Sequence, residues 1–171
     1  PYYASYASQK HLIELAAKHN VQRFVRLTGL SLSFSAFNPF NVLFNMMLSC
    51  TNRYNLLGEQ ALAAGKVPYV ILHPGGLSDV PRNTSTSNLQ VDPSGALPFP
   101  SRIGRDDVTA LCVAVADGTS SGVLPTDQSY VLACRWVGEN MEPKPQGTME
   151  DGFSTVSECL ERLVQAKSTP P

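Results

Sequence analysis

The sequence predicts an α/β domain with a mostly parallel sheet and helices on both faces of that sheet. Apolar residues recur at helical spacing in residues 8–20, and a short β-favouring run, residues 23–29, follows directly. The same order returns in residues 41–64, which keep helical spacing, and in residues 67–72, a continuous apolar run. Alternating helices and strands favour parallel strands joined by right-handed crossovers.

The composition fits one folded domain and points to no charged partner. The chain has 171 residues, is 43% hydrophobic and carries a net charge of -1 at pH 7, which suits a single domain over residues 1–171 with a buried core. Its 13 basic and 14 acidic residues form no long run of either sign, so we expect neither a nucleic-acid nor a membrane partner. No apolar stretch approaches the roughly 18 residues of a membrane-spanning helix. The composition leaves the oligomeric state open.

The start of the chain and its cysteines bear on its surroundings. The sequence begins at Pro1 rather than at a methionine, so a targeting segment, if the protein has one, is not in the chain. We expect the cytoplasm or the stroma of an organelle. The cysteines are scattered singly, with no CxxC pair and no histidine at metal-ligand spacing. We therefore expect no metal site and reduced, mostly buried thiols at Cys50, Cys112, Cys134 and Cys159.

The first helix and strand have recognisable ends. Ser8 precedes the helical pattern and is available as an N-terminal cap, and Asn20 follows the pattern as a stop. The strand then ends in Thr28 and Gly29, as expected where a strand stops at a loop. Residues 30–40 mix Ser, Phe, Asn and Pro without a steady period, so we expect an irregular loop there.

The second helical region leads into a buried strand. Residues 41–64 form either one long helix or two broken ones, with Gly58 as the weak point in the middle. Residues 67–72 lie between Gly65 and a Pro-Gly-Gly turn, the pattern of a parallel strand covered on both faces. We predict that residues 23–27 and 67–72 are neighbouring parallel strands, because a long helical connection joins them.

The C-terminal part of the chain begins with an irregular stretch. Residues 78–100 are rich in Ser, Thr, Asn, Pro and Gly, so we expect a long loop outside the sheet. We expect it to be the least ordered internal segment and able to close over a site. After one more helix, residues 129–134 are predicted as a strand and residues 135–150 as a linker. A last helix, residues 155–164, opens with a Thr-x-x-Glu capping box.

Three segments together resemble a known family. AAKHNVQRFVRLTG, GEQALAAGKVPYVILHPGGL and SRIGRDDVTALCVAVAD are similar to successive signatures of atypical short-chain dehydrogenase/reductase proteins, the NmrA-like NAD(P)-binding group. They stand in the right order and span roughly residues 8–117. The resemblance implies a Rossmann-like, doubly wound sheet, present here as its incomplete C-terminal portion, with the cofactor across the C-terminal ends of the strands.

The resemblance also implies which residues face the cofactor. These are Thr28, Gly29 and Leu30 at the end of the first strand, and Pro74, Gly75, Gly76 and Leu77 in the turn after the second. Glycines let backbone groups reach a flat ring that a Cβ would block, although a Pro-Gly-Gly run is also an ordinary turn. The implied cofactor is NAD(P), with NADP the expected form, bound only together with the missing N-terminal half. A small-molecule substrate is the second implied partner.

The chain departs from the family in the part that holds the pyrophosphate. A glycine-rich loop after a first strand seats this group at a helix N-terminus, and no such loop occurs in these residues. It lies upstream of Pro1 or the protein lacks it. The residue that distinguishes NAD from NADP follows the second strand of such domains and is missing as well.

The catalytic pair of the family is a second departure. In active members the lysine of a Tyr-xxx-Lys pair lowers the pKa of the tyrosine, whose phenol exchanges a proton during hydride transfer. Here Tyr54 has Gly58 at the lysine position. If the register is anchored on Glu59, the lysine position falls on Asn55 and the tyrosine position on Thr51.

The catalytic residues therefore stay unknown at this stage, and three functions remain open. We expect Tyr54 to be a half-buried helix residue. The chain then belongs to an oxidoreductase-like enzyme, to a non-catalytic dinucleotide-sensing or assembly protein, or to an interaction protein without cofactor. We expect His73 to hydrogen-bond a loop. Arg105 and Asp106, which resemble part of an Arg-Asp-Val signature, are expected to tie a helix start to the preceding segment.

Overall fold

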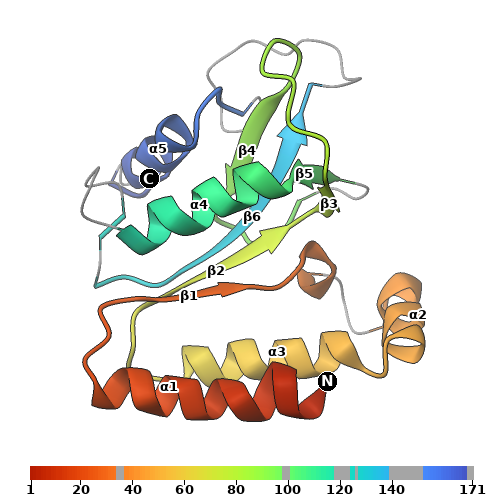
Figure 1. Ribbon diagram of the computed structural model, residues 1–171, viewed down its shortest axis with the longest axis vertical. Coiled ribbons are helices and arrows are strands. Elements are labelled where there is room, and N and C mark those ends of the chain that lie inside the picture. Colours follow the sequence, from red (N-terminus) through yellow and green to blue (C-terminus); the bar gives the residue numbers. More distant parts are fainter. Residues whose placement is uncertain (34–36, 98–100, 118–123, 126, 139–151, 169–171) are drawn as a thin grey trace.

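The computed structural model describes residues 1–33, 37–97, 101–117, 124–125, 127–138 and 152–168. In this part of the chain, the main sheet has the strand order β1-β2-β6-β4, and helices cover both of its faces (Figure 1). The strands are β1 (Phe24–Leu27), β2 (Tyr69–Pro74), β4 (Asn88–Asp92) and β6 (Tyr130–Val137). Neighbours in the run β1-β2-β6 are parallel, and β4 joins β6 in the antiparallel sense.

The larger core lies between the sheet and two C-terminal helices. Alternate residues of β2 and β6 point to this face, where they meet α4 (Arg105–Asp117) and α5 (Val156–Ser168), drawn above the strands in Figure 1. Leu72, Leu111, Leu132 and Leu160 are among its fully or almost fully buried members. This burial of apolar surface supplies the main driving force for folding.

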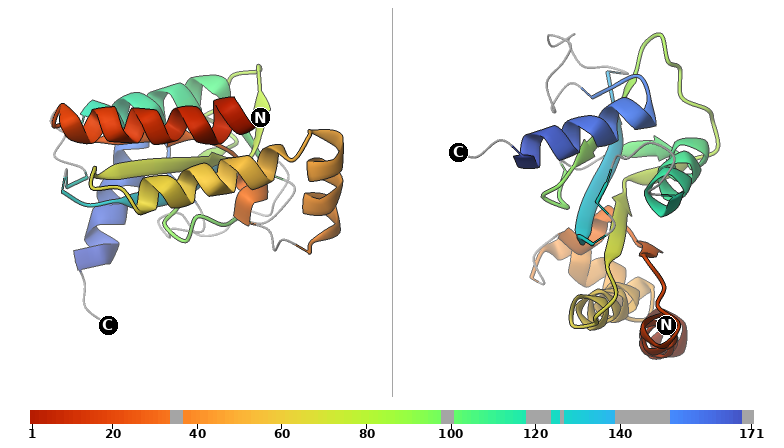
Figure 2. Two further views of the ribbon diagram at one scale, coloured as in Figure 1. Left: turned by 90° about the horizontal axis from the view of Figure 1, so that it is seen from below. Right: turned by 90° about the vertical axis from the view of Figure 1, so that its left-hand side faces the viewer.

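The opposite face carries a smaller core beneath the two N-terminal helices. Ile71 of β2 packs with Ile13 of α1 (Ser8–Lys18) and Leu62 of α3 (Thr51–Ala63). The two helices run side by side along this face in both Figures 1 and 2. Because both faces of β2 are covered, its sequence is continuously apolar rather than alternating.

The predicted pairing of the first two strands is confirmed. β1 and β2 are parallel neighbours with Phe24 opposite Tyr69 and Leu27 opposite Leu72. The expected α/β fold with a mostly parallel sheet is likewise confirmed. Asn20 has a φ of 53° directly after α1, the left-handed conformation with which helices often end.

The expected cap at Ser8 is wrong. A π-helical turn, η1 (Tyr2–Ala7), runs straight into α1, so Ser8 has helical dihedrals instead of the extended backbone of a cap. Its hydroxyl donates a hydrogen bond to the carbonyl of Ala4 at 2.7 Å. The helical segment therefore begins several residues before Ser8, where the apolar spacing alone had predicted its start.

The helical region after β1 is broken, but not at Gly58. A 3-10 turn, η2 (Leu30–Ser33), and α2 (Pro39–Met47) come first, and α3 begins at Thr51. The break has positive φ at Ser49 and Cys50, 51° and 62°. α3 then runs unbroken through Gly58, where a Cβ would lie 2.5 Å from the carbonyl oxygen of Ser5 and would also meet the guanidinium of Arg26. The missing side chain of Gly58 leaves room for the Ser5 carbonyl and the Arg26 side chain to pack against α3, and the helix is not interrupted there.

The prediction that residues 78–100 stay outside the sheet is wrong for residues 88–92. These residues form β4, whose Leu89 and Val91 are buried against the α4/α5 face while Gln90 lies between them. Period-2 burial of apolar side chains stabilises this strand although its flanks are rich in turn residues. The start of this stretch also contributes to a small parallel sheet of β3 (Gly76–Ser78) and β5 (Arg102–Gly104). Residues 98–100 lie outside the described residues.

The predicted linker, residues 135–150, also begins in the sheet. β6 continues to Val137, pairing with β4 through Trp136 and Arg135, and residues 139–151 lie outside the described part. The last helix is confirmed together with its capping box. The Glu158 amide donates to the Thr155 hydroxyl at 3.3 Å, and the Thr155 amide donates to the Glu158 carboxylate at 3.2 Å.

The start of α4 is fixed by Asp107 rather than by Asp106. Asp107 accepts hydrogen bonds from Trp136 at 2.6 Å and from the buried Arg82 at 3.3 Å. Arg82 also donates to the carbonyls of Ser87 and Ser154. Arg105 does tie the helix start to the preceding segment, through an exposed ion pair with Asp79 at 2.6 Å, whereas Asp106 is exposed.

The described helices and the cysteines show two further features. None of the helices in the described ranges is both long enough and apolar enough to cross a membrane. All four cysteines are free thiols, of which Cys134 and Cys159 are buried and Cys50 is exposed. Burial raises the pKa of the Cys134 thiol to about 12, so this thiol is a protonated core residue at neutral pH.

We predict that Gly58→Ala destabilises the domain by about 1–3 kcal/mol because its Cβ overlaps the Ser5 carbonyl. This is opposite to the gain of roughly 1 kcal/mol that alanine gives in an open helix. Urea unfolding monitored by circular dichroism measures the change. Gly29→Ala is the control, since its Cβ would meet nothing nearer than the Ser31 hydroxyl at 3.9 Å. Equal stability of Gly58→Ala and the wild type would contradict the packing.

We predict that Asp107→Asn lowers the free energy of unfolding by about 1–3 kcal/mol, because it removes the negative partner of the buried Arg82 guanidinium. The neighbouring Asp106→Asn is the matched control, with an expected change within about 0.5 kcal/mol at an exposed site. Chemical denaturation of both variants checks the assignment. A larger loss in Asp106→Asn than in Asp107→Asn would show that the helix start is held differently.

Candidate functional site

The residues predicted to face a cofactor meet at one edge of the sheet. β1 and β2 are parallel neighbours, so Thr28 and Pro74 both lie at the carboxyl ends of their strands. The Thr28 amide continues the ladder by donating to the Leu72 carbonyl at 3.0 Å, and the Gly75 amide donates to Cys134 at 3.0 Å. In open α/β sheets this carboxyl edge is where ligands bind.

Only part of the predicted set is accessible from outside. Leu30 is 4% exposed and packs with Leu97 and Ala133 in a small core cluster. Pro74 and Gly75 are buried as well. Thr28 and Gly29 are half-buried, whereas Gly76 and Leu77 are exposed. Of the predicted set, Thr28, Gly29, Gly76 and Leu77 are therefore the residues that a ligand could reach from outside.

The glycines of the predicted site differ in what surrounds them. A Cβ on Gly75 would lie 2.5 Å from the Ser101 hydroxyl and 2.7 Å from its carbonyl, so this glycine is required by the chain's own packing. At Gly76 the nearest atom would be the Ser101 carbonyl at 3.4 Å. At Gly29 the space is open, with the Ser31 hydroxyl at 3.9 Å as the nearest atom. Open space over backbone at a strand end fits the close approach of a flat ring.

Three polar side chains form a hydrogen-bonded chain at this edge. The Thr28 hydroxyl donates to Oε1 of Glu59 at 2.6 Å, and the same oxygen lies 3.0 Å from Nε2 of His73. Nδ1 of His73 lies 3.0 Å from the carbonyl oxygen of Gly95. The imidazole and the carboxylate are both largely buried, with exposed side-chain fractions of 6% and 11%. The prediction that His73 hydrogen-bonds a loop is confirmed, but its partner Glu59 was not foreseen.

The contacts of His73 define where its proton sits. The Gly95 carbonyl only accepts hydrogen bonds, so Nδ1 carries a hydrogen, and Nε2 shares a proton with Glu59. Burial lowers the pKa of His73, but the hydrogen bond and the charge of Glu59, together with the Gly95 bond, outweigh this effect and raise the pKa overall. Arg26 opposes the rise through its positive charge. The pair therefore favours an imidazolium beside a carboxylate.

The positions of the family's Tyr-xxx-Lys pair hold no such pair. Tyr54 is half-buried and packs edge-on against Tyr2, with ring centroids 5.7 Å apart. Gly58 is buried beneath Arg26. In the alternative register, Asn55 uses its backbone carbonyl to accept a hydrogen bond from Arg26 at 3.1 Å. Tyr54 is thus the half-buried helix residue that the spacing predicted.

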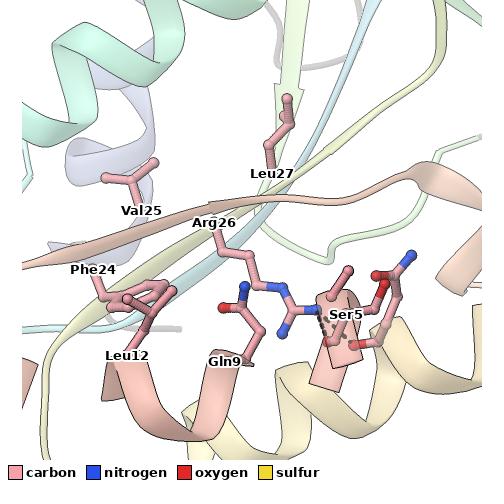
Figure 3. A pocket seen from close by; sticks show the side chains of 9 residues that line it. Ser5, Gln9, Leu12, Phe24, Val25, Arg26 and Leu27 are labelled. Carbon is pink, nitrogen blue, oxygen red and sulfur yellow. Dashed lines mark hydrogen bonds between the residues drawn. The ribbon is translucent and has the colours of Figure 1, made fainter. Parts of the chain in front are cut away.

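A pocket lies along the outer edge of β1, and the sequence analysis did not predict it. This pocket of about 360 Å³ is lined by residues of η1, α1 and β1 together with Asn55 (Figure 3). The Arg26 guanidinium reaches into this region and donates through Nη2 to the carbonyls of Ser5 and Asn55. Its Nη1 is buried and has no hydrogen-bond partner among the residues that the structure describes. The isolated position of Arg26 in an apolar strand was the only available sign.

No metal centre is evident in the described ranges, where no group of three or more His, Cys, Asp or Glu side chains is arranged to hold an ion. The chemistry that the edge offers is instead a proton-bearing pair, Glu59 and His73, reaching the surface through Thr28. Open backbone lies beside it at Gly29. These features suit the binding of an uncharged ring and the exchange of a proton.

Comparisons with solved structures agree with this fold. An NAD-dependent epimerase/dehydratase from Bacillus halodurans aligns with a TM-score of 0.63 at 15% identity, covering 93% of this chain and 60% of that protein. An oxidoreductase from Lactococcus lactis gives a TM-score of 0.63 at 13% identity, covering 98% and 64%. A short-chain dehydrogenase/reductase from Veillonella parvula, solved with NADP, gives 0.54 at 15%, covering 88% and 64%. The chain therefore spans less than two thirds of each of these structures.

The sequence itself matches a protein family described as NAD(P)H-binding over residues 4–119. A search of curated protein sequences found no match. The matched range contains β1, β2 and the predicted cofactor-facing residues, and the solved structures are described as an NAD-dependent epimerase/dehydratase, an oxidoreductase and a short-chain dehydrogenase/reductase. The resemblance to atypical short-chain dehydrogenases is thereby confirmed, and the chain belongs to the NAD(P)H-binding family, with a Rossmann-like fold.

Proposed function

We propose that this chain provides the nicotinamide side of an NAD(P) site in an oxidoreductase-like protein. The observation that carries the proposal is that β1 and β2 are parallel neighbours, so that Thr28 and Gly29 follow β1 at the same carboxyl edge at which β2 ends before Gly76 and Leu77. The backbone is open to a flat ring at Gly29, and a hydroxyl stands beside it at Thr28. When bound, the dinucleotide supplies a hydride to a carbonyl or accepts one from an alcohol.

The pyrophosphate side of the site is proposed to come from residues outside this chain. The chain covers only 60–64% of the solved structures that it resembles. In the described residues β1 is an edge strand of the parallel run, so its outer edge is open to pairing with a further strand. Leu27 is 46% exposed at this edge, and the pocket of Figure 3 runs along it. A further parallel strand docked here would cover both.

Residues 79–87 and 93–97 remain the proposed cover of the site. They flank β4 and follow the cofactor-facing turn. One contact ties this stretch to the edge, the carbonyl of Gly95 on Nδ1 of His73. NADP is the form to test first, because the Veillonella parvula relative was solved with it.

A non-catalytic sensing or assembly role is the second candidate. It is favoured by α2, in which Asn41 is buried towards the body of the domain while the described apolar side chains Phe40, Val42, Leu43, Met46 and Met47 are exposed. Asn52 donates to Asn41 at 3.0 Å on the inner side, whereas Met46 and Met47 are 78% and 72% exposed. Exposed apolar patches of this kind often bind another protein. Oxidation of NADPH by the full-length protein with carbonyl or quinone compounds decides between enzyme and sensor.

We predict that residues 1–171 alone bind NADPH far more weakly than the full-length protein, because they lack the helix N-terminus that holds the charged pyrophosphate. Isothermal titration calorimetry of both proteins measures the difference. Micromolar binding by residues 1–171 alone would contradict the division of the site.

Two variants of the full-length protein test the nicotinamide side itself. Gly29→Leu fills the open space over the strand end and is expected to weaken NADPH binding by at least about tenfold, roughly 1.4 kcal/mol. Ala110→Leu enlarges an exposed residue of α4 by a similar amount and serves as the control with unchanged affinity. Equal affinities of the two variants would remove Gly29 from the site.

A further inference from the structure

We propose that Thr28, Glu59 and His73 form a proton relay in which the Thr28 hydroxyl exchanges a proton with the oxygen of an alcohol or carbonyl substrate. The proposal rests on the proposed function, since it needs a nicotinamide ring at the carboxyl edge of β1. It assigns the proton-transfer role of the absent Tyr-xxx-Lys pair to residues from three different elements.

The geometry makes Thr28 the outer end of this relay. Its hydroxyl donates to Oε1 of Glu59 at 2.6 Å, and the residue is half-buried beside the open space of Gly29. With its hydrogen directed at the carboxylate, the hydroxyl oxygen has lone pairs free for a donor such as an alcohol. Glu59 and His73 are the inner members, held 3.0 Å apart and shielded from water.

The proton balance closes in both directions. In carbonyl reduction the Thr28 hydroxyl rotates its hydrogen from Glu59 to the substrate oxygen. The substrate carbon gains a hydride from the nicotinamide, and its oxygen takes the Thr28 proton. Thr28 regains a proton from Oε1 of Glu59, which receives the Nε2 proton of His73. The pair then passes from imidazolium and carboxylate to neutral imidazole and carboxylate, and water restores the lost proton. Alcohol oxidation runs through the same states in reverse, beginning from neutral imidazole.

The groups around His73 determine the pH range in which His73 carries the proton that the relay transfers. Glu59 on α3 raises the pKa of His73 by hydrogen bond and charge, and the Gly95 carbonyl adds to the rise. Burial and the charge of Arg26 on β1 act in the opposite direction. Reduction requires the protonated pair, so its rate falls as the pH rises through the pKa of His73, whereas alcohol oxidation is lost as the pH falls through it.

An ion pair with only a structural role would also hold α3 against β2. The first test therefore measures the protonation of His73 directly. The pKa of His73 in the full-length protein is measured from its imidazole resonances by NMR, assigned with His73→Asn. We expect a pKa above the ordinary histidine value of roughly 6.5 and a clear fall in Glu59→Gln. An unchanged pKa of His73 in Glu59→Gln would overturn the relay.

The second test separates proton transfer from binding. In steady-state reduction of a carbonyl or quinone compound, Thr28→Val is expected to lower kcat by about 100-fold or more with NADPH affinity retained. Thr28→Ser is expected to restore most of this loss. Thr109→Val makes the same change at an exposed hydroxyl that bonds the Arg105 carbonyl within α4, and its kcat is expected to equal that of the wild type.

The pH profiles complete the experiment. In reduction by the wild type, kcat is expected to fall as the pH rises through the pKa of His73, whereas Glu59→Gln is expected to lose kcat about as severely as Thr28→Val does, because an amide cannot pass a proton from His73 to Thr28. If the wild type binds NADPH and turns over while Thr28→Val keeps the wild-type kcat, the relay is wrong and the proposed function stands. If the full-length protein neither binds NADPH nor reduces any carbonyl, the proposed function fails and the relay with it.

Discussion

The parallel pairing of β1 with β2 is the constraint on which the rest of the structure depends. Its register places Leu27 opposite Leu72, so the next residues, Thr28 and His73, emerge together at the carboxyl edge. β2 is buried on both faces, between the α1/α3 layer and the α4/α5 layer. Slipping the register by one residue would exchange the side chains that face the two cores and disrupt the packing of both. The candidate site is therefore fixed by the core and not by the loops around it.

Polar side chains are buried next to this pairing, and their hydrogen bonds shape the edge. Arg26 is 5% exposed and crosses above Gly58 to reach the carbonyls of Ser5 and Asn55. Glu59, one residue along α3, turns instead to Thr28 and His73. A buried carboxylate without these donors would be strongly unfavourable. The same contacts that make Glu59 tolerable in the interior also bring a transferable proton to the surface at Thr28.

The sequence predicted the parts of the fold that rest on local periodicity. The helix of residues 8–18, the paired strands and the capping box of Thr155 and Glu158 all follow from spacing and end residues. β4 was missed because its alternation covers only residues 88–92 and is flanked by turn-forming residues. The break at Cys50 was missed because neither glycine nor proline marks it. The contact of Glu59 with His73 joins two elements, and no local pattern encodes such a contact.

The central claim is that the nicotinamide ring sits against the ends of β1 and β2. Chemical-shift mapping of the backbone amides of the full-length protein with saturating NADPH, compared with an analogue that lacks the nicotinamide, tests this claim most directly. The account predicts that the ring-dependent shifts concentrate at Thr28, Gly29, Gly76 and Leu77. Ring-dependent shifts confined to β4 and α5, with these four amides unmoved, would contradict it.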